Sequence, residues 1–261
     1  GITRRGLRAM VRNLRGMTRR QARDIVRESV AVDHRLDDED VNVVLAAKRR
    51  ALQTDGLLQY VETPLTLDDI GGMRKLKSWL RRRRGAFDEA AATFGLEAPR
   101  GVLMLGVQGA GKSLCAKATA TAWQQPLLRM DPSALYAKYI GQSEENLRRA
   151  LRQVEMMAPA VLWIDEIEKA FASAASQSSD GGLSKRMFGT LLTWMQDHAQ
   201  AVFVVATAND IEALPPELLR KGRFDEVFFV GLPKKAARRK IFEIHIRKRG
   251  RDGAGFDLDQ L

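Results

Sequence analysis

The stretch GVLMLGVQGAGKS, residues 101–113, decides the fold of this chain. Its first half is a short apolar run typical of a buried strand, and its second half has the spacing G-x-x-x-x-G-K-[ST]. Glycines at this spacing let backbone N–H groups wrap a phosphate, and the N-terminus of a following helix favours the same anion. The stretch therefore predicts a phosphate-binding loop between a strand and a helix.

Two side chains of this loop carry the chemistry that a nucleotide needs. Lys112 would bring a positive charge to the β and γ phosphates, and Ser113 would offer a hydroxyl to Mg²⁺. The alternative is a glycine-rich turn that carries Lys-Ser by chance, but the strand before it and the helical pattern after it favour the nucleotide site. The predicted nucleotide contacts in this loop are Gly106, Gly109, Ala110, Gly111, Lys112, Ser113 and Leu114.

Five short apolar runs of strand length recur along the chain, one directly before the loop and four after it. They are GVLML (101–105), PLLRM (126–130), AVLWI (160–164), AVFVVAT (201–207) and EVFFV (226–230). Amphipathic helical stretches separate them, for example 142–157 and 183–197. Buried strands that alternate with helices are typical of a parallel sheet covered on both faces, so we predict an α/β fold with five parallel strands.

The first 60 residues have a helical pattern instead. Thr18 and Gln21 form a capping box that opens one helix, and Asp37 can cap a second. The stretch QYVETPLT that follows is predicted to be an extended linker, because Pro64 disfavours helix at the residue before it.

Composition limits the class of protein without choosing a partner. The chain has 43 Lys and Arg against 32 Asp and Glu, so its net charge of +11 permits nucleic acid, an anionic membrane or an acidic partner. No apolar run approaches the ~20 residues of a membrane span. One cysteine, Cys115, excludes an internal disulfide and fits a reducing compartment. The start at Gly1, without a secretory signal, leads us to expect a piece of a longer protein.

Two adjacent carboxylates end the run AVLWIDEIEK, residues 160–169. Asp165 can hold Mg²⁺ through its water shell, and Glu166 can polarise an attacking water. An ordinary helix N-cap is the alternative for Asp-Glu after a strand. With a phosphate loop upstream, the pair indicates a nucleotide hydrolase.

Together these motifs resemble the AAA+ ATPases, in the AAA subgroup that carries a second region of homology. The resemblance covers residues 66–261 and is strongest at the loop and carboxylates above and at three further motifs. These are LDDIGG (67–72), VVATAND (204–210) and PPELLRKGRFDE (215–226). It implies a P-loop NTPase core with a helical N-terminal segment and linker over 1–63, a large ATPase subdomain over 64–231 and the start of an incomplete helical lid over 232–261.

The resemblance also implies roles for residues in those motifs. Asn209 would be the sensor beside the γ-phosphate and the attacking water, and Arg220 and Arg223 would reach the ATP of the next subunit in a homo-oligomeric, hexameric ring. On spacing alone, these arginines would be an exposed basic turn. ATP and Mg²⁺ are the implied cofactors, and the adenine contacts would come from Asp69, Ile70 and Gly71.

The chain departs from the family pattern at a few positions. Val107 and Gln108 stand where many members have two prolines, Ser113 where many have Thr, and Ala208 where Thr is usual before the sensor. None of these changes removes a required group. The combination of DEIEKAF, SDGG and GLLQYVETP is most similar to the single-ring AAA proteins of the conserved chloroplast reading-frame group and their bacterial relatives.

The triplet YIG, residues 139–141, lies where this family carries an aromatic–aliphatic–glycine loop into a central pore. The resemblance implies that Tyr139 contacts a translocated chain, with Ile140 behind it and Lys138 adding charge. The polar stretch 173–182 falls where a second pore loop is expected. The alternative for Tyr139 is an ordinary core position.

Three functions from different classes remain open at this point. The first is a ring-shaped ATP-driven motor that remodels or threads a protein client, in the bacterial cytoplasm or an equivalent such as the plastid stroma. The second is a nucleic-acid motor or loader, suggested by Arg81–Arg84 and by the stripe Arg19, Arg23 and Arg27. Residues 17–52 could then be a helix-turn-helix, although ordinary helix packing and helix-dipole effects explain these features too. The third is a slow nucleotide-dependent switch or scaffold.

Overall fold

The computed structural model describes most of the chain. The described residues are 1–14, 17, 19–31, 35–37, 40, 43–44, 46, 57–62, 67–87, 91, 93–123, 125–132, 142–169, 183–220, 222–252 and 256–258. The predicted pore residues Lys138, Tyr139 and Ile140, the stretch 173–182 and the capping residue Thr18 lie outside this set.

A six-stranded sheet forms the centre of the molecule, with strand order β1-β3-β4-β5-β2-β6. The strands are β1 (Leu58–Val61), β2 (Gly101–Gly106), β3 (Leu127–Met130), β4 (Ala160–Ile164), β5 (Val202–Ala208) and β6 (Glu226–Val230). Strands β2 to β6 occupy the five predicted apolar runs, and all the pairings among them are parallel. The α/β prediction is therefore confirmed.

The prediction of a purely parallel, five-stranded sheet was wrong at one edge. Strand β1 pairs antiparallel with β3, with Leu58 opposite Met130, where an extended linker was predicted. Leu58 is only 2% exposed and belongs to the same apolar cluster as Met130. Burial of this side chain stabilises the added strand, which ends at Val61.

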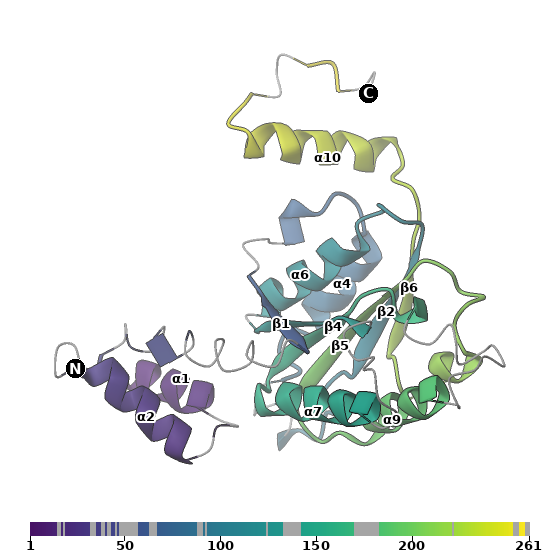
Figure 1. Ribbon diagram of the computed structural model, residues 1–261. Helices are drawn as coiled ribbons and strands as arrows, with labels where there is room; N and C mark the ends of the chain where they lie inside the picture. Colours follow the sequence, from purple (N-terminus) through teal and green to yellow (C-terminus); the bar gives the residue numbers. More distant parts are fainter. Residues whose placement is uncertain are drawn as a thin grey trace.

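Helices cover both faces of the sheet (Figure 1). On one face lie α4 (Arg74–Arg82) and α6 (Lys112–Trp123), and on the other lie α7 (Gln142–Met156) and α9 (Leu183–Asp197). Rings from α4, α6 and β5 meet in the first layer, where the centroids of Trp123 and Phe203 are 4.6 Å apart. No described helix is long and apolar enough to cross a bilayer.

The N-terminal helices α1 (Arg4–Leu14) and α2 (Arg19–Val30) lie to one side of this core in Figure 1. Helix α2 begins right after the predicted capping residue and leaves its arginines exposed. The Asp37 amide donates to the Asp40 carboxylate at 2.8 Å, a contact expected where Asp37 caps a helix.

Helix α10 (Lys235–Lys248) follows β6 and packs over residues 67–73. Gly71 makes this close approach possible, since a Cβ there would lie 2.5 Å from Ile241 Cγ1. Lys248 Nζ also lies 3.3 Å from Asp69 Oδ1. The segment predicted to cover the adenine therefore packs against α10, the helix predicted to begin the lid.

Candidate functional site

The phosphate-loop sequence has the predicted order of strand, loop and helix. Strand β2 ends at Gly106 and α6 begins at Lys112. Gly106, Gly109 and Gly111 all have positive φ, at 149°, 78° and 93°. These conformations favour residues without a Cβ, so the spacing of the glycines reflects the backbone path that the loop takes between β2 and α6.

Lys112 folds back over this loop. Its ammonium donates to Gly106 O at 2.7 Å, to Val107 O at 2.8 Å and to Asn209 Oδ1 at 2.8 Å, and the residue is 7% exposed. Burial lowers the pKa of Lys112, while the negative charges of Glu168, Asp165 and Glu166 act in the opposite direction. All three ammonium protons are engaged, so a bound phosphate would exchange for one or more of these acceptors.

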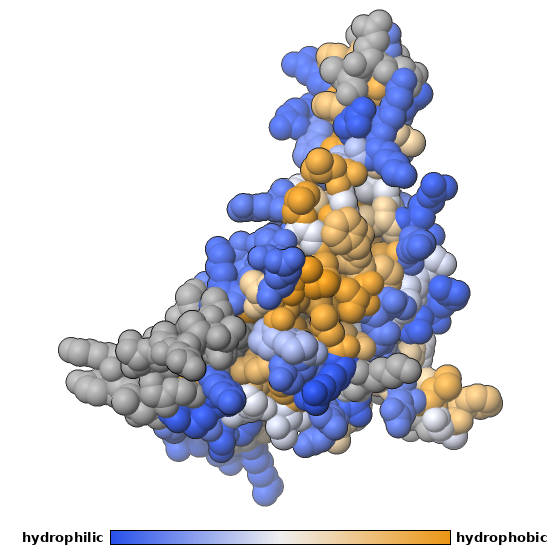
Figure 2. Space-filling view, turned by 90° about the vertical axis from the view of Figure 1, so that its right-hand side faces the viewer, coloured by the Kyte–Doolittle hydropathy of each residue, from blue (hydrophilic) through white to orange (hydrophobic). Residues whose placement is uncertain are grey.

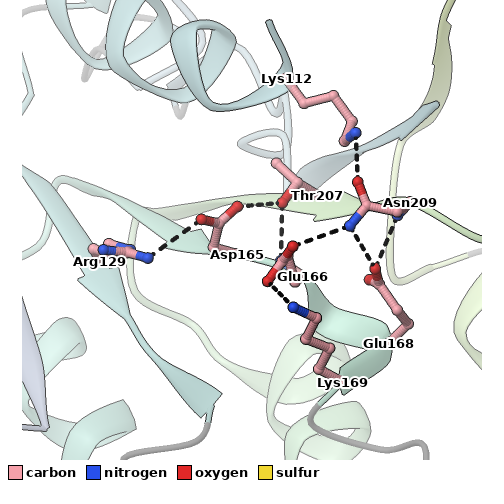
Figure 3. A network of polar contacts seen from close by, with 8 residues as sticks. All are labelled: Lys112, Arg129, Asp165, Glu166, Glu168, Lys169, Thr207 and Asn209. Carbon is pink, nitrogen blue, oxygen red and sulfur yellow. Dashed lines mark hydrogen bonds and ion pairs between the residues drawn. The ribbon is translucent and has the colours of Figure 1, made fainter. Parts of the chain in front are cut away.

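Asp165 stands at the carboxyl end of β4 with both of its oxygens engaged (Figure 3). Thr207 Oγ1 donates to Asp165 Oδ1 at 2.6 Å, and Arg129 Nη2 lies 3.3 Å from Asp165 Oδ2. The carboxylate is thereby fixed between side chains from the two neighbouring strands, β5 and β3.

Glu166 is held in a left-handed backbone conformation, with φ 50°. Its amide donates to Thr207 Oγ1 at 3.0 Å, and its carboxylate accepts from Lys169 Nζ at 2.7 Å and from Asn209 Nδ2 at 3.1 Å. The hydrogen bond from Lys169 lowers the pKa of Glu166, with further lowering by the charge of Lys169 and by Asn209. Glu166 is therefore ionised at neutral pH, as a base that polarises water must be.

Asn209 links Lys112 of the phosphate loop to the acidic residues that follow β4. Its side-chain oxygen accepts from Lys112, while its Nδ2 donates to Glu166 and, at 3.0 Å, to Glu168 Oε1. Glu168 Oε1 also accepts from the Asn209 backbone amide at 3.0 Å. One carboxylate oxygen thus fixes both the backbone and the side chain of the predicted sensor residue.

Sequence reasoning missed Glu168 and Arg129. Glu168 is 7% exposed, and its signal was a third acidic residue in the run DEIE after β4. Arg129 was signalled by a single charge inside the otherwise apolar run PLLRM. Both residues contact the predicted site from neighbouring positions, as Figure 3 shows.

The oxygen donors fit Mg²⁺ held together with a nucleotide. Among the described residues no three His, Cys, Asp or Glu side chains are grouped to hold a metal by themselves. Ser113 at the start of α6 and Asp165 after β4 offer one hydroxyl and one carboxylate, the hard oxygen donors that Mg²⁺ combines with phosphates and water.

The predicted adenine segment begins with a short 3₁₀ helix, Leu67–Asp69, and lies beside the loop. Lys77 Nζ donates to Ile70 O at 2.7 Å, and Met73, with φ 51°, accepts from the Cys115 thiol at 2.9 Å. A Cβ on Gly111 would lie 3.6 Å from Met73 Cε. Contacts from α4 and α6 thus position this segment next to the phosphate loop.

Arg220 and Arg223 follow the 3₁₀ helix Pro216–Leu219. Arg220 is exposed, and Arg223 is half-buried with an Nη1 that is buried but has no hydrogen-bond partner among the described residues. Neither arginine pairs with a described member of the network around Lys112. The structure therefore does not bring them into the site of their own subunit.

Comparisons with known proteins agree with this geometry. The model of the ATPase family associated with various cellular activities (AAA) matches residues 102–232, and that of the SpoVK-like AAA ATPase second domain matches residues 1–55. Uncharacterized AAA domain-containing proteins ycf46 from Guillardia theta and Pyropia yezoensis are each 40% identical over 253 residues, 97% of this chain. A cell division cycle protein 48 homolog from Archaeoglobus fulgidus is 35% identical over 193 residues, covering 70% of this chain and 26% of that protein. The chain spans about half the length of the ycf46 relatives, 50% and 51%.

Proposed function

Because the chain belongs to the AAA family of ATPases, we propose that it is the motor of a ring that remodels or threads a protein client. The family supports an ATP-hydrolysing enzyme, and the site carries the groups that hydrolysis requires. The observation on which the proposal depends is the contact chain from Lys112 through Asn209 to Glu166.

We assign the chemical steps to these side chains. Lys112 would leave its loop carbonyls and Asn209 for the β and γ phosphates, which frees the Asn209 side-chain oxygen. Glu166 would then accept a proton from the attacking water, and Asn209, fixed by Glu168, would orient that water. Bound Mg²⁺, held by Ser113 and Asp165, would neutralise charge that develops on the phosphates.

We propose that subunits assemble into a hexameric homo-oligomer, with Arg220 and Arg223 acting on the neighbour's ATP. The lack of a partner for Arg223 Nη1 within the described subunit supports a partner outside it. Figure 2 shows apolar side chains gathered below α10, on the side of the sheet where β6 forms the edge. Phe229 is 79% exposed, and Leu232 and Val227 are exposed nearby along the chain. Such an exposed apolar area supports contact with another protein surface.

The proposed client-binding residues are Lys138, Tyr139 and Ile140, between β3 and α7. They follow β3 in the sequence after the seven residues 131–137, and β3 carries Arg129, which contacts the proposed metal carboxylate. Movement at the nucleotide could therefore reach the client through β3.

We also propose a reducing compartment, such as bacterial cytoplasm or plastid stroma. Burial raises the pKa of the Cys115 thiol to about 12, which keeps the thiol protonated there.

A nucleic-acid motor or loader is the second candidate, because Arg19, Arg23 and Arg27 are exposed on α2. The Arg81–Arg84 run supports it less, since the Arg83 guanidinium stacks 4.0 Å from the Trp79 ring centroid. The deciding experiment measures ATP hydrolysis with a permanently unfolded protein or with mixed DNA and RNA. Stimulation by the unfolded protein supports remodelling of a protein client, and stimulation by nucleic acid supports a nucleic-acid motor or loader. Slow turnover that neither changes supports a switch or scaffold.

A further inference from the structure

Arg129 and Asp165 come together because of the register between β3 and β4. Arg129 lies opposite Trp163 in this parallel pair. Side chains two residues apart point to the same face of a sheet, so Asp165 is the next position on the face that carries Trp163. The Arg129 guanidinium lies 5.0 Å from the Trp163 ring centroid and 3.3 Å, through Nη2, from Asp165 Oδ2.

This arginine has few other polar partners in the described part of the chain. Its Nε is buried without a hydrogen-bond partner there, while the side chain as a whole is 36% exposed. The Asp165 side chain is 21% exposed, and its second oxygen accepts from Thr207. The positive charge of Arg129 therefore lies beside Asp165 Oδ2, the carboxylate oxygen that does not accept from Thr207.

We propose that Arg129 competes with the metal for Asp165 Oδ2 and thereby sets the Mg²⁺ dependence of nucleotide binding. The inference rests on the proposed role of Asp165 as the metal carboxylate. Thr207 already donates to Asp165 Oδ1, and Arg129 donates to Oδ2, so a metal-bound water would approach Oδ2 beside a fixed positive charge. An arginine cannot lose its proton to relieve the competition.

The surroundings of Arg129 allow this exchange. The side chain can give up Oδ2 and remain stacked on Trp163 with its partly exposed guanidinium in water. Arg129 is also the second-last residue of β3, directly before the segment that contains Tyr139. Arg129 is thus a positioning residue that acts through Asp165.

The test is an Mg²⁺ titration of the full chain with a non-hydrolysable fluorescent ATP analogue. Arg129→Leu and Arg129→Gln both remove the charge, and Gln keeps a donor should the Leu variant fail to fold. Each should lower the Mg²⁺ concentration at half-maximal binding by about tenfold, as expected on removing a like charge a few ångströms from a cation. Arg129→Lys keeps the positive charge, on which the competition depends, so its Mg²⁺ midpoint should stay within about twofold of the parent chain.

If Arg129 only stabilises the fold, a different result is expected. The two neutral variants would then melt at lower temperature while the Mg²⁺ midpoint stays where it is or rises, and that would overturn the inference. Arg148→Leu is the matched control, since it breaks an ion pair with Glu144 on α7 and should leave the midpoint unchanged.

Asp165→Asn separates this inference from the proposed function. If Asp165→Asn leaves the Mg²⁺ midpoint unchanged, Asp165 is not the metal carboxylate and the proposed assignment itself is wrong. If Asp165→Asn raises the midpoint but neither neutral Arg129 variant lowers it, the assignment stands and the role of Arg129 is rejected.

Discussion

Lys112 Nζ donates to Asn209 Oδ1 at 2.8 Å, which joins the phosphate loop to the end of β5 across the top of the sheet. The same asparagine donates to Glu166 and Glu168. The lysine proposed to bind phosphate and the glutamate proposed to polarise water therefore share one amide. A phosphate bound by Lys112 would break the contact between Lys112 and Asn209 and thereby change the hydrogen bonding of Glu166.

Lys112→Ala should abolish ATP binding. Hydrogen bonds to charged groups contribute ~1.5–3 kcal/mol each, so affinity should fall by about 100-fold or more. Glu166→Gln should keep binding and stop turnover, because an amide cannot accept the proton of water. Equilibrium binding of a fluorescent ATP analogue and phosphate release measure the two effects. Equal loss of binding in both variants would reject the role of Glu166.

Arg220→Ala or Arg223→Ala should leave nucleotide affinity nearly intact and lower hydrolysis by about 10³, as for arginine fingers elsewhere. This factor corresponds to about 4 kcal/mol of transition-state stabilisation. Arg152→Ala, at an exposed position of α7, is the control and should retain full activity.

Mixing experiments test whether the fingers act between subunits. Rings that contain both Arg220→Ala and Glu166→Gln chains should regain some activity wherever an intact Glu166 meets an intact Arg220. Oligomerisation is measured first by light scattering. Full hydrolysis by a monomer at high dilution would contradict action in trans.

Lys169→Gln should move the acid limb of the pH–rate profile to higher pH. The Lys169 hydrogen bond lowers the pKa of Glu166 from its ordinary value of 4.5, so its removal raises that pKa and protonates the base earlier as pH falls. Lys240→Gln breaks a similar pair with Glu243, a remote carboxyl whose pKa Lys240 lowers, and should leave the profile unchanged. The profile of kcat against pH measures both. An unmoved acid limb in Lys169→Gln would mean that Glu166 does not limit the rate.

Tyr139→Ala should shift thermal stability by no more than ~0.5 kcal/mol, keep basal ATP hydrolysis and lose client processing, because the ring would grip the client rather than fill the core. A buried tyrosine would instead cost ~3–5 kcal/mol on truncation. Tyr139→Phe is the control and should keep client processing, since it retains the ring. Melting temperature, basal ATPase and client processing are measured on both variants, and a large fall in melting temperature for Tyr139→Ala would count against the pore-loop assignment.

Features that depend on residues close together in the sequence could be predicted, whereas features that depend on distant residues could not. The loop from Gly106 to Ser113 could be predicted because its glycine spacing is local, and the five parallel strands because each is a short, mainly apolar run. Strand β1 was missed because its partner among the described strands, β3, lies far along the chain, and a pairing at that distance leaves no local pattern.

The side chains of the candidate site could likewise be predicted only where their placement depends on the local sequence. Asp165 and Glu166 follow a strand that periodicity predicts, whereas Arg129 meets Asp165 only through the register of β3 against β4. Glu168 reaches Asn209 across the end of β5, a contact that depends on the turn after β4. Register and turn geometry come from packing of the whole sheet, so neither residue could be assigned from the sequence.

The most direct test of the central claim is phosphate release by the full chain, assembled with Mg²⁺ and ATP, with and without a permanently unfolded protein. Glu166→Gln is the inactive reference, and mixed DNA and RNA are the competing stimulants. The proposal predicts that unfolded protein raises ATP hydrolysis severalfold in the parent chain, that Tyr139→Ala abolishes this stimulation while keeping the basal rate, and that nucleic acid has no effect. Stimulation by nucleic acid alone, or hydrolysis that persists in Glu166→Gln, would contradict it.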